Sequence, residues 1–211
     1  MPVDEPTLPE SLAERLVRAG FSDTGEFDGS IIEGLDSSEP RHRVLALRAG
    51  ARRQILTPEL WRHALGDPEV SVRRDALTLL AYEVIDFNEV APIVLEALED
   101  DEPLVVDAAI FALAEHLYAD AVVRVSELAL THDDPRCRET AIAALGAFGD
   151  ERGRHAVLAA LDDKPAVRRR AIVALSNFEG PDIDDALARA SEDRDWQVRA
   201  AVDQLTKDEP D

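Results

Sequence analysis

Apolar residues recur along the chain in short segments that each follow an acidic turn. In residues 167–175, VRRRAIVAL, the apolar positions are −1, +3, +4 and +7 when Arg168 is counted as zero. These four positions share one face of a helix at 100° per residue. Segments upstream of the turns, such as TPELWRHAL at residues 57–65, are amphipathic as well. The pattern predicts pairs of amphipathic helices joined by a turn.

The pairs repeat about every 31 residues, in six copies. Their second segments are residues 41–50, 71–80, 105–113, 137–145, 167–175 and 198–205. The turns before them read LDSSEP, LGDPEV, LEDDEP, THDDPR, LDDKPA and SEDRDW. Asp accepts the free N–H groups of a first helical turn, and Pro is tolerated there, so each turn predicts the end of one helix and the start of the next. A fixed period of this length predicts a solenoid in which each unit packs on its neighbours.

The chain ahead of the repeats predicts one separate helix. Ser11 and Glu14 fit a capping box, Leu12, Leu16 and Val17 form an apolar stripe, and Gly20 ends the helix. A stack of repeats needs a terminal unit to cover its open end. We therefore expect a capping helix and connector over residues 1–29, a solenoid over residues 30–206 and a frayed acidic tail over residues 207–211.

Composition agrees with an all-α fold. Hydrophobic residues make up 45% of the chain and aromatic residues only 5%. Ala and Leu dominate the apolar set, which favours close-packed helices over a sheet.

The recurring motif is an Asp turn, then Val-Arg, then Ala three residues after the Arg and Leu seven after it. This combination resembles the short HEAT-like repeats of the phycobilisome-lyase-like family, over residues 30–206. The resemblance implies a right-handed α-solenoid of about six HEAT-like helical hairpins with an N-terminal capping helix. Two copies depart from the motif, with Val106 in place of Arg and Val202 in place of Ala.

The recurrent Arg lies on the same side of the helix as the core, where it needs a carboxylate partner. The natural partner is an Asp of the turn, from the same unit or the next. We therefore expect a structural ladder of Asp and Arg along the stack. Its predicted members are Asp67, Arg73, Asp133, Arg138, Asp162, Arg168 and Arg199.

The charge is strongly acidic, with 44 acidic residues against 23 basic ones and a formal net charge of −21. Such a field opposes nonspecific binding to nucleic acid and anionic membranes. Only Lys164 and Lys207 are lysines. An acidic, lysine-poor surface resembles those of proteins from halophilic microbes, in which salt screens the repulsion. The alternative explanation of the acidic surface is that it binds a basic partner. Arg169 and Arg170 could touch phosphate, although a solvated helix face is the simpler interpretation.

Catalytic motifs are missing from the sequence. It has no phosphate-binding glycine loop, nucleophile elbow or H-E-x-x-H motif, and its five histidines lack metal-ligand spacing. Two kinds of HEAT-like enzyme offer a comparison: deoxyhypusine hydroxylase binds iron with His-Glu pairs, and HEAT-like DNA glycosylases use a basic groove. This sequence has no His-Glu dipeptide, and its charge is strongly acidic. Cys137 occupies a core position. We expect no enzyme activity, cofactor or metal.

Segments for targeting or for spanning a membrane are not recognisable either, and a single cysteine fits a reducing compartment. We expect a cytoplasmic protein, as a monomer or weak homodimer.

Positions +2, +5 and +9 of the second helices point away from the core and predict an interaction surface with an apolar stripe and a polar rim. Its predicted residues are Thr78, Tyr82, Phe111, Glu115, Thr140, Ala143, Arg170, Val173 and Asn177. Curvature of the stack could instead bury them in part. The surface predicts a non-enzymatic scaffold or adaptor that binds a protein or peptide on its concave face. The alternative is an accessory or lyase-like subunit that holds a tetrapyrrole or another cofactor.

Overall fold

The computed structural model describes residues 10–22 and 24–207 of the chain. These residues form thirteen α-helices and six short 3-10 helices, with no β-strand among them. The all-α prediction is confirmed. Residues 1–9 and 208–211, and with them most of the predicted acidic tail, lie outside the described part.

The helices fall into two compact units, residues 1–85 and residues 86–211. The first unit holds α1 (Leu12–Ala19), η1 (Gly25–Phe27), α2 (Asp28–Leu35), α3 (Pro40–Arg52), α4 (Pro58–Leu65) and α5 (Val70–Leu80). Helices α2 and α3 form the first pair and α4 and α5 the second.

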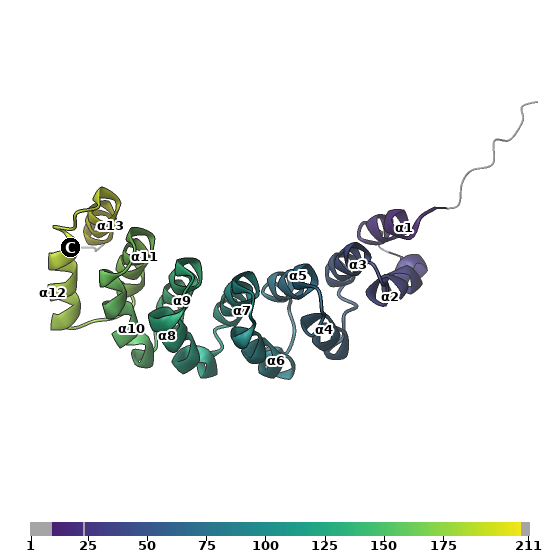
Figure 1. Ribbon diagram of the computed structural model, residues 1–211, viewed down its shortest axis with the longest axis horizontal. Helices are drawn as coiled ribbons and strands as arrows, with labels where there is room; N and C mark the ends of the chain where they lie inside the picture. The colour runs from purple at the N-terminus through teal and green to yellow at the C-terminus, as the bar shows by residue number, and fades with distance from the viewer. Residues whose placement is uncertain (1–9, 23, 208–211) are drawn as a thin grey trace, which may run out of the picture. The chain divides into compact units, whose positions relative to one another are not determined.

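The second unit contains the other four pairs. In chain order it holds η2 (Phe87–Glu89), α6 (Ala91–Glu96), η3 (Ala97–Glu99), α7 (Pro103–Glu115), η4 (Ala119–Ala121), α8 (Val122–Thr131), α9 (Pro135–Phe148), η5 (Glu151–Gly153), α10 (Arg154–Ala159), η6 (Ala160–Asp162), α11 (Pro165–Leu175), α12 (Pro181–Ala190) and α13 (Trp196–Lys207). Within this unit α7, α9, α11 and α13 form an inner row, and α6, α8, α10 and α12 form an outer row (Figure 1).

Proline starts most of the second helices, as the acidic turns predict. It occupies the first turn of α3, α7, α9 and α11. The Asp134 side chain accepts a hydrogen bond from the Arg136 N–H at the start of α9. This turn therefore separates two helices and satisfies an N–H group at the start of the next one.

The core lies between the rows and follows the predicted positions. In α11, Val167, Ala171, Ile172 and Leu175 are fully buried. Position +6 is buried as well, which the four-position pattern did not predict: Ala174 packs so closely that a Cβ at Gly146 would lie 2.8 Å from its Cα. Small residues here allow α9 and α11 to approach closely.

Helix α1 carries the predicted capping box. The Ser11 Oγ accepts from the Glu14 N–H, the Glu14 carboxylate accepts from the Ser11 N–H, and Gly20 caps the end of the helix. Leu16 is buried, whereas Val17, which the stripe included, is half exposed. Among the described residues no helix combines the length and the apolar character needed to cross a membrane.

Candidate functional site

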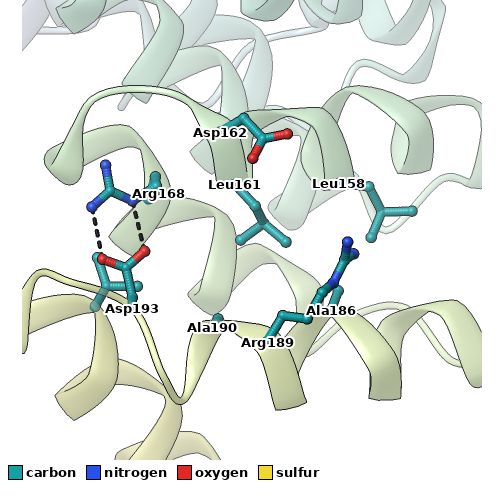
Figure 2. Close-up of a pocket in the computed structure, with 9 residues that line it drawn as sticks. Leu158, Leu161, Asp162, Arg168, Ala186, Arg189, Ala190 and Asp193 are labelled. Carbon is teal, nitrogen blue, oxygen red and sulfur yellow. Dashed lines mark hydrogen bonds and ion pairs between the residues drawn. The ribbon is translucent and has the colours of Figure 1, made fainter.

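Arg168 anchors the contact between the last two repeats. Its Nε and Nη2 donate to the two carboxylate oxygens of Asp193 at 2.9 and 2.7 Å, and its Nη1 donates to the Asp163 carbonyl at 2.8 Å. The Arg168 side chain is only 4% exposed. Figure 2 shows the two bonds to Asp193 that join α11 of the fifth repeat to the turn of the sixth.

Two other arginines repeat this geometry. Arg138 donates to both carboxylate oxygens of Asp163, at 2.6 and 2.7 Å, and Arg43 does the same to Asp67. Each also donates to a carbonyl of its own turn, at His132 and at Ser37. The arginine of one repeat therefore binds its own turn and the carboxylate of the following turn.

The other predicted ladder arginines also reach back to their own turns. Arg73 donates to the Asp67 carbonyl at 2.8 Å, and Arg199 donates to the Asp193 carbonyl at 2.7 Å.

Two predicted carboxylates of the ladder need correction. The partners of Arg138 and Arg168 are Asp163 and Asp193, whereas Asp162 ends η6 with its side chain exposed. Asp133 contributes its carbonyl to Arg138 but not its carboxylate. The reason is the spacing: the carboxylate in reach is the one whose side chain also caps the next N–H groups, as Asp193 does for Asp195.

The ion pairs shift the carboxyl groups of the ladder toward the charged form. Hydrogen bonds from Arg138 and Arg168 lower the pKa of Asp163 and Asp193 below its usual value. For Asp67, burial raises the pKa, but the bonds from Arg43 and the Glu69 N–H outweigh it and leave the pKa lowered. The ladder is therefore ionised at neutral pH.

One rung of the ladder has a different chemistry. Val106, which is buried, replaces the arginine of the third repeat. In the ion-paired rungs a carboxylate of the following turn pairs with the arginine. The corresponding position of the turn after Val106 is His132. The His132 Nδ1 accepts the Asp134 N–H, as an Asp does in other turns. The cation and its carboxylate partner are thus lost together.

The predicted apolar stripe lies on the inner row but is unevenly exposed. Val173 is 54% exposed, whereas Phe111 and Ala143 are half-buried. The stripe is thus partly covered, and its open end lies at α11.

Polar residues of the predicted rim form bonds between neighbouring inner helices. Thr140 of α9 donates to Asp107 of α7 at 2.5 Å, and Arg170 of α11 lies 3.5 Å from Glu139 of α9. Glu115 ends α7, and Asn177 lies just after α11, where both are exposed. The rim is therefore partly a structural element that joins the inner helices.

The predicted residues Thr78 and Tyr82 belong to the first unit. Thr78 lies on α5 and donates to the Arg74 carbonyl, and Tyr82 lies just after α5 with 70% of its surface exposed. On the same unit, Arg48 pairs with Asp75 and joins α3 to α5.

A groove between α11 and α13 brings the open end of the stripe together with residues that the sequence did not single out. It has a volume of about 300 Å³, and its lining residues are Arg169, Arg170, Val173, Trp196, Gln197, Ala200, Ala201 and Gln204. Trp196 is 67% exposed. Its position in the turn SEDRDW, outside the apolar register of the helix, was the signal that could have found it.

A second hollow lies between the fifth and sixth repeats. Figure 2 shows Leu158 and Leu161 on one side of it, Ala186 and Ala190 of α12 on the other, and the Arg168–Asp193 pair beside them. Its volume of about 180 Å³ is below the usual range of ligand pockets. Arg168 and Asp193, which line it, are already paired with each other.

Reactive groups are few in the described part of the chain. No three histidine, cysteine or acidic side chains come together there as a metal site would need. Cys137 is buried with its Sγ 3.2 Å from the Pro103 carbonyl oxygen, and burial raises the pKa of its thiol to about 11. This thiol is protonated at neutral pH.

Comparison of the sequence with known families gives one match, to HEAT repeats, at residues 92–165 and 124–206. The two matches together span more than half of the chain. The chain belongs to the HEAT-repeat family. No curated protein sequence matches it.

Solved structures agree with the HEAT-repeat fold. YibA of Escherichia coli is 18% identical, with a TM-score of 0.66 over 94% of this chain and 75% of that one. An engineered protein is 18% identical, with a TM-score of 0.64 over 84% of this chain and 94% of that one. A designed armadillo repeat protein, solved in complex with the peptide (KR)4, is 13% identical with a TM-score of 0.58, over 94% and 99% of the two chains. At these identities the likeness concerns the fold, which is a HEAT and armadillo type of solenoid.

Proposed function

We propose that this HEAT-repeat protein is a non-enzymatic scaffold that holds a protein or peptide segment on the inner row of helices in its second unit. The observation that carries the proposal is the groove between α11 and α13, where Val173 and Trp196 are more than half exposed. Large apolar side chains that stay exposed beside a polar rim are typical of interaction surfaces. The designed armadillo neighbour, solved in complex with the peptide (KR)4, supports peptide binding by a solenoid of this type.

Selection of random peptides displayed on phage tests the proposal directly. We expect the full chain to enrich peptides, and Val173→Asp to abolish their capture because a carboxylate replaces the apolar floor of the groove. Val123→Asp is the matched control, since Val123 of α8 is 52% exposed on the outer row. Both variants should keep the melting temperature of the wild type within a few degrees. Equal capture by the two variants would place the binding surface elsewhere.

We further infer that the scaffold works in a salt-rich cytoplasm. The support is compositional: 44 acidic residues against 23 basic ones, only two lysines, and one buried cysteine. Salt screens the repulsion among such acidic side chains and leaves buried ion pairs of the ladder less affected.

A further inference from the structure

Two arginines lie beside an exposed tryptophan in the groove between α11 and α13. Arg169 and Arg170 come from α11, and Trp196 begins α13. We propose that this groove binds a peptide segment in which a carboxylate side chain neighbours an apolar residue. The inference rests on the proposed function and specifies the chemistry of its partner.

Arg169 and Arg170 line the groove without a close carboxylate partner. Six of the eleven arginines of the second unit have a carboxylate oxygen within 3.1 Å: Arg124, Arg136, Arg138, Arg152, Arg154 and Arg168. Arg189 and Arg199 donate to backbone carbonyls instead. Arg169 has no ion pair or hydrogen bond with any described residue, and Arg170 has only Glu139 at 3.5 Å. Because the lining of the groove holds these two arginines and no acidic residue, it has a local excess of positive charge in an otherwise acidic chain.

The register of the inner helices explains why Arg169 is left over. Position +1 of one repeat bonds position +2 of the next, as Asp107 does with Thr140 and Glu139 with Arg170. Arg169 holds position +1, but the matching +2 position in the last repeat is Ala201, which has no polar group. The guanidinium of Arg169 is therefore available to a ligand in the groove.

The remaining lining residues suit a peptide. Trp196 and Val173 offer exposed apolar surface on either side of the groove, and an indole can also stack on an aromatic side chain. The amide groups of Gln197 and Gln204 can both donate to and accept from a peptide backbone. A groove of about 300 Å³ is at the lower end of the size range of ligand sites, which fits a few side chains.

The overall charge limits how acidic the ligand can be. A net charge of −21 repels polyanions such as nucleic acid. A single carboxylate is repelled much less and can accept charge-assisted hydrogen bonds from the guanidinium groups of Arg169 and Arg170. Two of the three acids in the adjacent turn have partners: Asp193 pairs with Arg168, and Asp195 accepts the Gln197 N–H. Charge complementarity therefore favours a short segment with one Asp or Glu.

The test uses the peptides selected on the full chain, remade in soluble form with Gln in place of their acidic residue. We expect Asp or Glu next to an aromatic or aliphatic residue in the enriched peptides. Replacing the peptide carboxylate by Gln, or the protein pair by Arg169→Gln with Arg170→Gln, should each weaken binding at least about tenfold, because a charge-assisted bond is lost. Arg124→Gln with Arg189→Gln, on the outer helices α8 and α12, removes the same charge and should leave the affinity unchanged.

The outcomes separate the two proposals. The carboxylate inference would be overturned by peptides whose binding depends on Val173 but not on Arg169 and Arg170, or by peptides that carry Lys or Arg in place of an acid. Either result would still support the proposed scaffold function. No enrichment of any peptide would overturn both. Binding of a single-stranded oligothymidylate that depends on Arg169 and Arg170 and is tighter than peptide binding would overturn the inference in favour of a phosphate backbone. Self-association that Trp196→Ala abolishes would overturn it in favour of a second copy of the chain.

Discussion

Arg168 and Arg169 are neighbours in the chain, but their side chains have opposite environments. Arg168 is buried and forms three hydrogen bonds across two turns, whereas Arg169 is exposed and has no polar partner among the described residues. Successive residues of a helix differ by 100°, so one can serve the core and the other the surface. The run of three arginines therefore combines structural support with a candidate binding group.

Alanine substitution should separate these two roles. Arg168→Ala removes the partner of Asp193 and leaves a largely desolvated carboxylate, so we expect the free energy of unfolding to fall by about 3 kcal/mol. Arg169→Ala is the matched control and should change it by less than about 0.5 kcal/mol. Urea denaturation followed by circular dichroism measures both. A stability of Arg168→Ala equal to that of the control would show that the ladder does not support the fold.

At the scale of elements, the repeats hold together through a register that links each turn to the next. Arg43, Arg138 and Arg168 all pair with an Asp that lies 24 or 25 residues further along. The third repeat has Val106 and, 26 residues further along, His132 at the corresponding positions, so the charges are missing on both sides. Neighbouring repeats are therefore matched to one another at this position.

Restoring the missing rung tests the register. Val106→Arg alone places a cation in a buried site, so it should destabilise the protein strongly. His132→Asp in the same chain supplies the carboxylate, and the double variant should recover at least about 1 kcal/mol relative to the sum of the single changes. A thermodynamic cycle of the four proteins measures this coupling. Additive effects would mean that positions 106 and 132 are not a rung of the ladder.

The sequence predicts the elements well because their signals are local. Hydrophobic period, proline and the Ser11–Glu14 box depend on residues within one or two turns of each other. The partner of Arg168 is not local, since Asp162 and Asp193 are equally acidic and only the packed stack places one of them in reach. Trp196 lies in the turn SEDRDW, outside the apolar register, which signals an exposed side chain, but only the packed stack forms the groove that it lines with α11.

For the whole molecule, the balance of charge decides how stability responds to salt. With a net charge of −21, acidic side chains repel one another across the surface, and this repulsion opposes the folded state. The ladder pairs are largely buried and are screened less by salt. Salt therefore weakens the repulsion among surface carboxylates more than it weakens the attraction within the ladder pairs.

We accordingly expect the melting temperature to rise by several degrees between 0.05 and 1 M KCl at pH 7. Differential scanning calorimetry measures the change. Most of the rise should occur at low concentration, where screening of surface charge is most sensitive to salt. A melting temperature that falls over this range would contradict the dominance of surface repulsion.

The most direct test of the binding face uses the two tryptophans as internal reporters. Trp196 is exposed in the groove of the second unit, and Trp61 is 1% exposed within α4 of the first. In a ¹⁵N-labelled protein, the indole N–H signals of the two residues can be followed while a selected peptide is added. We expect the Trp196 signal to shift with saturation and the Trp61 signal not to move. Saturable binding that leaves Trp196 unchanged would contradict the assignment of the groove between α11 and α13 as the binding site.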